Sequence, residues 1–178
     1  GLEDAIVIEV CASASTQSGK IVEAVNFNAP GQIVIAGASE AVTKACELLK
    51  AAGAKRALPL PVSAPFHSSL LKPASEKLKT YLENIEFHVP TIPVINNVDV
   101  SILDNPAAIK NALVRQAAKP VRWQETIRAM SARGVGQVVE CGPGKVLAGL
   151  TKRIDDQLQG MALMDEASLM EVMQTLKS

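Results

Sequence analysis

Apolar and polar positions in the first third of the chain follow two periods, one typical of helices and one typical of strands. Residues 2–14 and 39–52 repeat apolar side chains at helical spacing, and Gly53 stands just past the second segment, as glycine often does at a helix end. Residues 21–28 alternate apolar and polar side chains, which is typical of a half-buried strand. The pattern therefore predicts helices over residues 2–14 and 39–52 and strands over residues 21–28, 33–37 and 56–62.

The predicted order in this region is helix, strand, strand, helix, strand. Residues 56–62 are expected at a sheet edge, because Pro59 and Pro61 lack the N–H that a central strand needs. A ferredoxin-like split βαβ unit has this order with one more strand in front. The chain also begins at Gly1 rather than methionine. We therefore expect residues 1–62 to form such a unit missing its first strand, with the upstream part lying outside the sequence.

From residue 63 onward, helical segments alternate with short apolar runs. The spacing predicts helices over 69–84, 106–117, 123–132, 145–158 and 166–176, and strands over 92–98, 137–141 and 161–164. Strands that alternate with helices are typical of a mainly parallel α/β sheet. We therefore expect residues 63–178 to form a second, α/β part of the molecule.

Composition and charge narrow the classes of function. The 178 residues contain 18 Lys and Arg against 18 Asp and Glu, and aromatic residues make up 3% of the chain. A protein without a basic excess or stacking aromatics is a poor candidate for nucleic-acid binding. No apolar run reaches the ~18 residues that a membrane-spanning helix needs. The sequence therefore predicts a protein without nucleic-acid or membrane partners.

Cysteine and glycine patterns argue against metals and nucleotide cofactors. Cys11, Cys46 and Cys141 are widely spaced, and no C-x-x-C or histidine cluster accompanies them, so we expect no disulfide framework and no metal site. Free thiols favour the reducing cytoplasm as the location, and Cys141 is expected to be a buried apolar residue. The segment CGPGK (141–145) lacks both ends of a phosphate-binding loop and predicts a tight turn between a strand and a helix. No dinucleotide fingerprint follows a predicted strand, so no cofactor is expected.

Two histidines are the candidates for proton transfer. His67, in VSAPFHSSL, lies between a predicted strand and a predicted helix, where α/β folds often place catalytic residues, although a structural role is equally open on the residues alone. His88, in IEFHVP, is expected to be an exposed loop residue. No serine has the G-x-S-x-G setting of a nucleophile elbow, and Ser68 and Ser69 are expected to cap the following helix. The residues thus offer a candidate base without a nucleophile.

Five segments together resemble one family, the malonyl-CoA:acyl carrier protein transacylases of fatty-acid synthesis. The segments are NFNAPGQIVIAG (26–37), AGAKRALPLPVSAPFHSSLLKPA (52–74), PVINNVD (93–99), LVRQAAKPVRW (113–123) and ECGPGKVLAGLTKRI (140–154). The resemblance implies an α/β-hydrolase-like large subdomain with a ferredoxin-like small subdomain inserted in it. Residues 1–62 would then be most of the small subdomain and residues 63–178 the C-terminal part of the large one.

The resemblance also implies a reaction and its residues. Members of this family carry a malonyl group from malonyl-CoA to the phosphopantetheine thiol of acyl carrier protein through a malonyl-serine intermediate, with a histidine as general acid and base. His67 matches that histidine, and Gln116, in LVRQ, matches the residue whose backbone carbonyl orients it. Phe66 and Asn28 fall at positions expected to bind substrate. Phe66, in APFH, resembles the phenylalanine found where malonyl is preferred over methylmalonyl.

Basic residues near two of the predicted helices offer a surface for the carrier protein, which is strongly acidic in this family's pathways. They are Arg122, Arg128, Arg133, Lys145, Lys152 and Arg153. An ordinary solvated face is the alternative explanation for these charges.

The sequence lacks three parts of the family's machinery. The serine elbow, which resembles G-H-S-L-G, the arginine that pairs with the malonyl carboxylate and the glutamine-containing oxyanion loop lie upstream in relatives and have no counterpart in this sequence. We therefore expect the C-terminal part of the enzyme, with the upstream segment as a partner and without activity of this chain alone. Two alternatives stay open: a non-catalytic acyl-carrier or CoA-binding module, and an α/β serine hydrolase that releases malonate to water.

Overall fold

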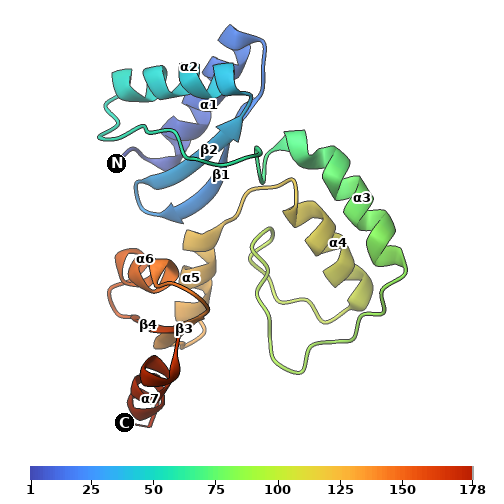
Figure 1. Cartoon of the computed structure of the whole chain (residues 1–178), viewed down its shortest axis with the longest axis vertical. Helices are drawn as coiled ribbons and strands as arrows, with labels where there is room; N and C mark the ends of the chain where they lie inside the picture. The colour runs from blue at the N-terminus through green and yellow to red at the C-terminus, as the bar shows by residue number, and fades with distance from the viewer. Residues whose placement is uncertain (178) are drawn as a thin grey trace. The chain divides into compact units, whose positions relative to one another are not determined.

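The computed structural model describes residues 1–177 of the chain, which divide into two compact units (Figure 1). The first unit spans Gly1–Trp123 and the second spans Gln124–Ser178. The boundary expected at residue 62 falls inside the first unit, so the division into small and large subdomains stays a prediction.

The first unit begins with two helices packed on a two-stranded hairpin. Its elements are α1 (Asp4–Ser18), β1 (Val22–Ala29), β2 (Gln32–Gly37) and α2 (Ser39–Ala51), and β1 and β2 pair antiparallel. One apolar core joins them: Val7, Cys11, Ala14, Val22, Ala24, Ala41, Ala45 and Leu49. Burial raises the pKa of the Cys11 thiol to about 11, so this cysteine serves packing rather than chemistry. All four predicted elements are present within a few residues of their predicted ends.

The hairpin ends at a glycine that its neighbours require. A Cβ atom at Gly37 would lie 2.1 Å from the carbonyl oxygen of Ile21, a distance that no side chain tolerates. The Ala38 N–H donates to the same oxygen at 2.8 Å. The close approach lets the chain leave β2 and enter α2 within two residues.

Residues 56–62 do not form the predicted strand. Among residues 1–177, the sheet of the first unit holds β1 and β2 alone, and no ladder joins residues 56–62 to it. A strand needs a hydrogen-bonding neighbour, and Pro59 and Pro61 have no N–H to donate. The apolar side chains of Leu58, Leu60 and Val62 are left more than half exposed. The prediction was wrong because apolar residues alone do not supply a pairing partner.

The rest of the first unit is helical. A short 3-10 turn, η1 (Ser69–Leu71), leads into α3 (Lys72–Glu83), and α4 (Pro106–Gln116) follows a long connection. The buried hydroxyl of Ser75 donates to the carbonyl oxygen of Val114 at 2.6 Å and ties α3 to α4. The strand predicted over residues 92–98 is reduced to one bridge, Ile95 with Ile102, because the chain folds back on itself at residues 96–101.

The second unit contains a parallel pair of strands with a helical crossover. Its elements are α5 (Trp123–Ser131), which starts at the unit boundary, β3 (Gln137–Cys141), α6 (Val146–Ile154), β4 (Gln159–Leu163) and α7 (Glu166–Thr175). β3 and β4 run parallel, with Val139 opposite Met161, and parallel neighbours need such a crossover. Asp165 caps α7 by accepting the Ser168 N–H at 2.8 Å. The prediction of alternating strands and helices is confirmed in this unit.

The glycine-rich segment after β3 is a tight turn, as predicted. Gly142 and Gly144 have φ angles of 149° and 129°, which favour glycine, and the Gly142 N–H donates to the carbonyl oxygen of Leu163 at 3.1 Å. Cys141 was expected to be buried, but its side chain is exposed because β3 ends at this residue and the turn carries the chain away. Cys141 is therefore not part of a core.

Candidate active site

His67 lies in the loop that enters η1, and its ring contacts the end of α4. Its Nδ1 atom is 3.0 Å from the backbone carbonyl oxygen of Gln116. Because a carbonyl oxygen can only accept, the neutral imidazole that makes this hydrogen bond carries its proton on Nδ1 and its lone pair on Nε2. The structure thus brings together the two residues predicted as catalytic. Their catalytic roles stay predictions.

The loop around His67 is held by hydrogen bonds within the loop and to β1. His67 has a φ angle of 63°, a conformation that residues other than glycine rarely adopt. The fully buried hydroxyl of Ser68 donates back to the carbonyl oxygen of Pro65 at 2.7 Å. The Ser69 N–H donates to Oε2 of Glu23, on β1, at 2.6 Å. Neither serine side chain forms the predicted helix cap, because the Ser68 hydroxyl is committed to the loop and the Ser69 N–H is capped by Glu23.

Gln116 uses its backbone and its side chain for different partners. It is the last residue of α4, where backbone carbonyls lack partners inside the helix, so its carbonyl oxygen is available to His67. Its side-chain Oε1 accepts the Asn97 N–H at 3.1 Å. Sequence reasoning missed this contact and the one made by Glu23, because they join residues 19 and 46 positions apart that no local pattern connects.

A small, mostly apolar cavity of about 290 Å³ lies beside the histidine. Its lining residues are His67, Leu78, Leu82, Leu113, Gln116 and Ala117. The leucines come from α3 and α4, so the packing of these helices forms an apolar wall on one side of the His67–Gln116 contact. A hydrogen bond next to apolar surroundings is electrostatically stronger than one in water.

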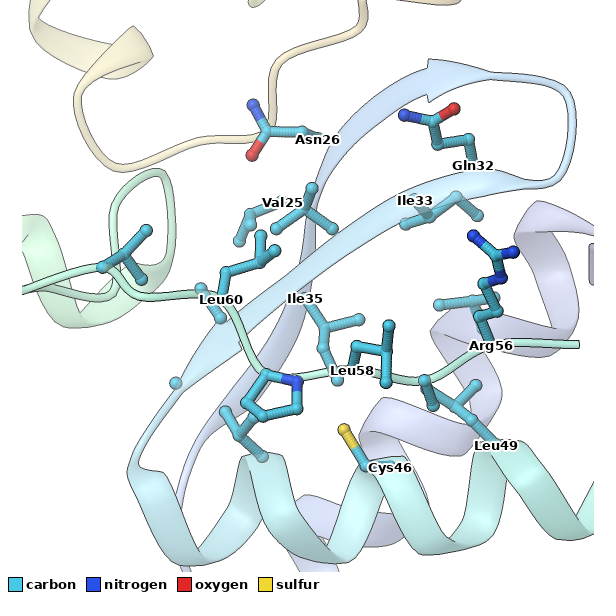
Figure 2. A pocket seen from close by; sticks show the side chains of 18 of the residues that line it. Val25, Asn26, Gln32, Ile33, Ile35, Cys46, Leu49, Arg56, Leu58 and Leu60 are labelled. Atoms are coloured by element: carbon cyan, nitrogen blue, oxygen red, sulfur yellow. The ribbon is translucent and has the colours of Figure 1, made fainter. Parts of the chain in front are cut away.

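A larger cavity of about 890 Å³ lies between the hairpin, α2 and residues 56–62 (Figure 2). Its walls are mostly apolar and include Ile33 and Ile35 of β2, Cys46 and Leu49 of α2, and Leu58 and Leu60. Asn28 and Phe66, the two residues predicted to bind substrate, also line it, and Phe66 is 51% exposed. The structure places both residues on the wall of one cavity, and Phe66 directly precedes His67 in the sequence. Substrate binding by Asn28 and Phe66 stays a prediction.

The second histidine lies in the open. The His88 side chain is 81% exposed, and its Nε2 atom is 3.9 Å from a carboxylate oxygen of Glu86. The prediction of an exposed loop residue is confirmed. His88 is therefore a matched control for substitutions of His67.

The arrangement can act as a positioned base. Within the described residues, His67 makes its hydrogen bond to Gln116 and none to a hydroxyl or thiol that it could activate. In the same part of the chain, no three side chains of His, Cys, Asp or Glu gather as metal ligands would. None of the helices that the structure describes combines the length and apolar character needed to cross a membrane.

Known proteins resemble this chain along nearly its whole length. The family described as acyl transferase domain matches residues 7–176. The malonyl CoA-acyl carrier protein transacylase of Escherichia coli strain K12 is 53% identical over 169 residues, which are 95% of this chain and 54% of that protein. The crystal structure of an acyl-carrier-protein S-malonyltransferase from Burkholderia pseudomallei matches with a TM-score of 0.94 and 60% identity, over 98% of this chain and 56% of that one.

A third relative was solved with a partner. It is a malonyl-transacylase in complex with its type II PKS acyl-carrier protein, and it matches with a TM-score of 0.95 and 52% identity, over 98% of this chain and 56% of that one. The chain therefore spans about half the length of the relatives it matches. These matches confirm the resemblance found in the five segments and the α/β fold class, an incomplete acyltransferase fold. The chain belongs to the acyl transferase domain family.

Proposed function

We propose that His67 is the general acid and base of a malonyltransferase. The enzyme would move a malonyl group from malonyl-CoA to the phosphopantetheine thiol of acyl carrier protein in fatty-acid synthesis. The observation that carries this proposal is the 3.0 Å contact between His67 Nδ1 and the Gln116 carbonyl oxygen, which leaves Nε2 as a base. The names of the relatives support the substrates, since they are malonyl transacylases or an S-malonyltransferase.

The first half of the reaction acylates a serine that lies outside residues 1–178. The serine oxygen attacks the thioester carbon of malonyl-CoA, and His67 Nε2 takes the hydroxyl proton as the new C–O bond forms. The proton then passes to the CoA sulfur as the C–S bond breaks. In the second half, the phosphopantetheine thiol gives its proton to Nε2 and attacks the malonyl ester. The serine oxygen recovers the proton as it leaves.

The Gln116 carbonyl holds the Nδ1 proton through both halves. The oxygen carries no formal charge, so it fixes the tautomer and direction of the imidazole without the negative charge that an aspartate would add. When Nε2 takes a proton, the carbonyl dipole still points its negative end at the ring. We infer that the backbone carbonyl oxygen is the group of Gln116 that acts on the imidazole.

We place the acyl group beside Phe66 and Asn28. Both residues line the 890 Å³ cavity, and Phe66 directly precedes the proposed base. The Asn28 amide can donate to an acyl or carboxylate oxygen, and the Phe66 ring can pack against the acyl carbon chain. No metal or cofactor takes part in this scheme.

Exposed basic residues of the second unit support the proposal of an acidic protein partner. Lys145, Lys152, Arg128 and Arg133 are exposed there, on or next to α5 and α6. Positive charge on a surface speeds docking of an acidic carrier protein by electrostatic steering. The three free cysteines support a reducing cytoplasm as the place where the protein works.

Substitution of His67 tests the proposal. In a protein that carries both this chain and the serine-bearing segment, we expect His67→Ala to lower malonyl transfer by roughly a hundredfold or more, the usual effect of losing a general acid–base group. His88→Ala is the matched control and should leave the rate unchanged. Transfer is measured as malonylated carrier protein by intact-protein mass. Equal rates for both variants and wild type would contradict the proposal.

The same assay separates the two alternative functions. An α/β serine hydrolase would release free malonate as its main product and leave the carrier protein unmodified. A non-catalytic carrier or CoA-binding module would bind malonyl-CoA without forming any acyl-enzyme. Either result would replace the proposed transferase.

A further inference from the structure

Two residues other than glycine have positive φ angles in the described part of the chain. They are His67, at 63°, and Val100, at 57°. Val100 is the more unusual, because its branched Cβ crowds the backbone in this conformation. Strained residues of this kind persist only where the surrounding contacts force them, and they gather at functional sites. Hydrogen bonds between His67 and Gln116, between Gln116 and Asn97, and between Asn96 and Val100 connect these two residues through the adjacent positions 96 and 97.

Val100 lies in a turn, residues 96–101, that closes on itself. The Asp99 N–H donates to Oδ1 of Asn96 at 2.7 Å, and the Val100 N–H donates to the Asn96 carbonyl oxygen at 3.1 Å. The side-chain amide of Asn96 donates across the turn to the Ser101 carbonyl oxygen at 2.9 Å. One asparagine therefore bonds three other residues of the turn and fixes its shape.

The turn holds the last two residues of α4. The Arg115 guanidinium donates two hydrogen bonds of 2.6 Å to the Asp99 carboxylate, and its Nε donates to Oδ1 of Asn111 at 2.7 Å. Gln116 accepts the Asn97 N–H through its side chain. Hydrogen bonding to Arg115 lowers the pKa of Asp99, so the ion pair stays charged at neutral pH. Two adjacent residues of one helix end thus contact the same rigid turn.

We propose that residues 96–101 are a positioning turn, which holds the Gln116 carbonyl oxygen where it keeps the His67 proton on Nδ1. Backbone carbonyls at a helix C-terminus have no intrahelical partner and fray easily, so the direction of this oxygen depends on what else holds α4. The contacts of Arg115 and of the Gln116 side chain with the turn hold the end of α4, and His67 binds the Gln116 carbonyl oxygen itself. The inference rests on the proposed function of His67 and adds the residues that orient it.

The alternative is a purely structural turn that stabilises α4. The two roles predict different results, because a structural turn changes the stability of the helix without changing the tautomer of His67. The tautomer is read directly from the ¹⁵N chemical shifts of histidine-labelled protein that consists of residues 1–178. His88 serves as the exposed reference within each sample, and His88→Gln assigns the two signals.

We expect Arg115→Met and Asp99→Asn to lower the ratio of Nδ1–H to Nε2–H tautomer at His67 by roughly fivefold, the factor that corresponds to one lost hydrogen bond. The ratio at His88 should stay the same. The control is Asn105→Ala, which removes the N-cap of α4, where the Asn105 side chain accepts the Ala107 and Ala108 N–H groups. It weakens the same helix at the opposite end and should leave the His67 ratio unchanged.

Val100→Gly separates positioning from stability if either charge variant fails to fold. Glycine adopts φ 57° without strain, so this variant keeps every side-chain hydrogen bond of the turn but lets its backbone move. We expect a lower Nδ1–H ratio at His67 and a melting temperature no lower than that of Asn105→Ala. A melting temperature that falls with an unchanged tautomer ratio would show that the turn is only structural.

These outcomes are independent of the test of catalysis. Unchanged tautomer ratios in all three turn variants overturn the positioning turn, whatever His67→Ala does to malonyl transfer. If the turn variants shift the ratio but His67→Ala leaves transfer unchanged, the turn positions His67 and the proposed function of that residue is wrong.

Discussion

Two regions of the first unit adjoin at Phe66 and His67. They differ in whether the groups that line them are paired within the chain. The histidine region, which consists of His67, Gln116 and the positioning turn, is closed by polar contacts that the chain makes with itself. The cavity between β2, α2 and residues 56–62, which we name the open groove, has apolar walls (Figure 2). The chain contains what is needed to orient a base. Within residues 1–177, no hydroxyl or thiol is hydrogen-bonded to His67, and the groove is left open.

The two edges of the hairpin also differ in whether they have a hydrogen-bonding partner. β1 is hydrogen-bonded on its second side, because the Phe27 N–H donates to Val121 at 2.9 Å and the Val121 N–H donates to Val25 at 2.8 Å. Within the described residues, β2 pairs with β1 alone, and its residues line the open groove. An unpaired edge beside apolar walls is the setting in which another strand adds to a sheet. We propose that the groove takes a strand from the upstream segment that also carries the serine.

The largest effect we expect is on activity of the chain by itself. Residues 1–178 alone should show no malonyl transfer, because a base without a nucleophile cannot form the acyl-enzyme. Addition of the serine-bearing segment, as a separate chain or a fusion, should restore transfer. The measurement is malonylated carrier protein by mass. Rapid transfer by the isolated chain would mean that the nucleophile lies within these residues. It would contradict the view that the chain supplies only the base.

Phe66 stands between the two regions and should decide acyl size. In the complete protein, Phe66→Ser should raise the methylmalonyl-to-malonyl rate ratio by about fivefold to 150-fold, since relief of steric crowding in a tight site is worth about 1–3 kcal/mol. The malonyl rate should be largely kept. The two rates are compared with both thioesters at equal concentration.

A matched control comes from the other side of the same cavity. Leu58→Ser also exposes a polar group to the groove but is not next to His67, and it should leave the ratio unchanged. A loss of both rates in Phe66→Ser, together with a lower melting temperature, would make Phe66 a packing residue and remove it from substrate selection.

Local patterns predicted the parts of this fold that depend on local spacing. Helical periodicity located α2 and α4, and the turn after β3 followed from its glycines. The strands expected over residues 56–62 and 92–98 failed because pairing depends on a neighbour that a single segment does not reveal. Apolar, β-branched residues fit a strand only when another strand supplies the hydrogen bonds.

The site was predictable in part. His67 was a candidate from its place between elements, but Gln116 entered only through the resemblance to a family, since a backbone carbonyl leaves no trace in the type of side chain. Glu23 and Asn97 were missed because their contacts join distant positions and use backbone N–H groups. Reactive residues are therefore easier to predict from a sequence than the residues that hold them in place.

Gln116→Ala tests whether the backbone or the side chain of Gln116 matters more for transfer. The alanine keeps the carbonyl oxygen that binds His67, but the Asn97 N–H loses its acceptor. The loss of one such hydrogen bond costs about 0.5–1.5 kcal/mol, so transfer should fall by roughly twofold to tenfold. Gln17→Ala, on the exposed surface of α1, is the control and should have no effect. A hundredfold loss at Gln116 would mean that its side chain, rather than its backbone, acts on the reaction.

The smallest effect should be that of Leu60→Ala, in the wall of the open groove, on the stability of the chain. Leu49 and Leu60 both line the cavity, but Leu49 is 7% exposed and belongs to the core, whereas Leu60 is 55% exposed. Leu49→Ala should lower the free energy of unfolding of the chain by about 2–5 kcal/mol through the cavity it leaves. Leu60→Ala should change it by less than about 0.5 kcal/mol, because little apolar surface there is out of water. Urea unfolding measures both. If the upstream strand fills the groove, the cost of Leu60→Ala should rise in the complete protein, because the strand then buries that side chain. A large cost in the isolated chain would show that residues 56–62 already pack tightly, and the groove would not be open.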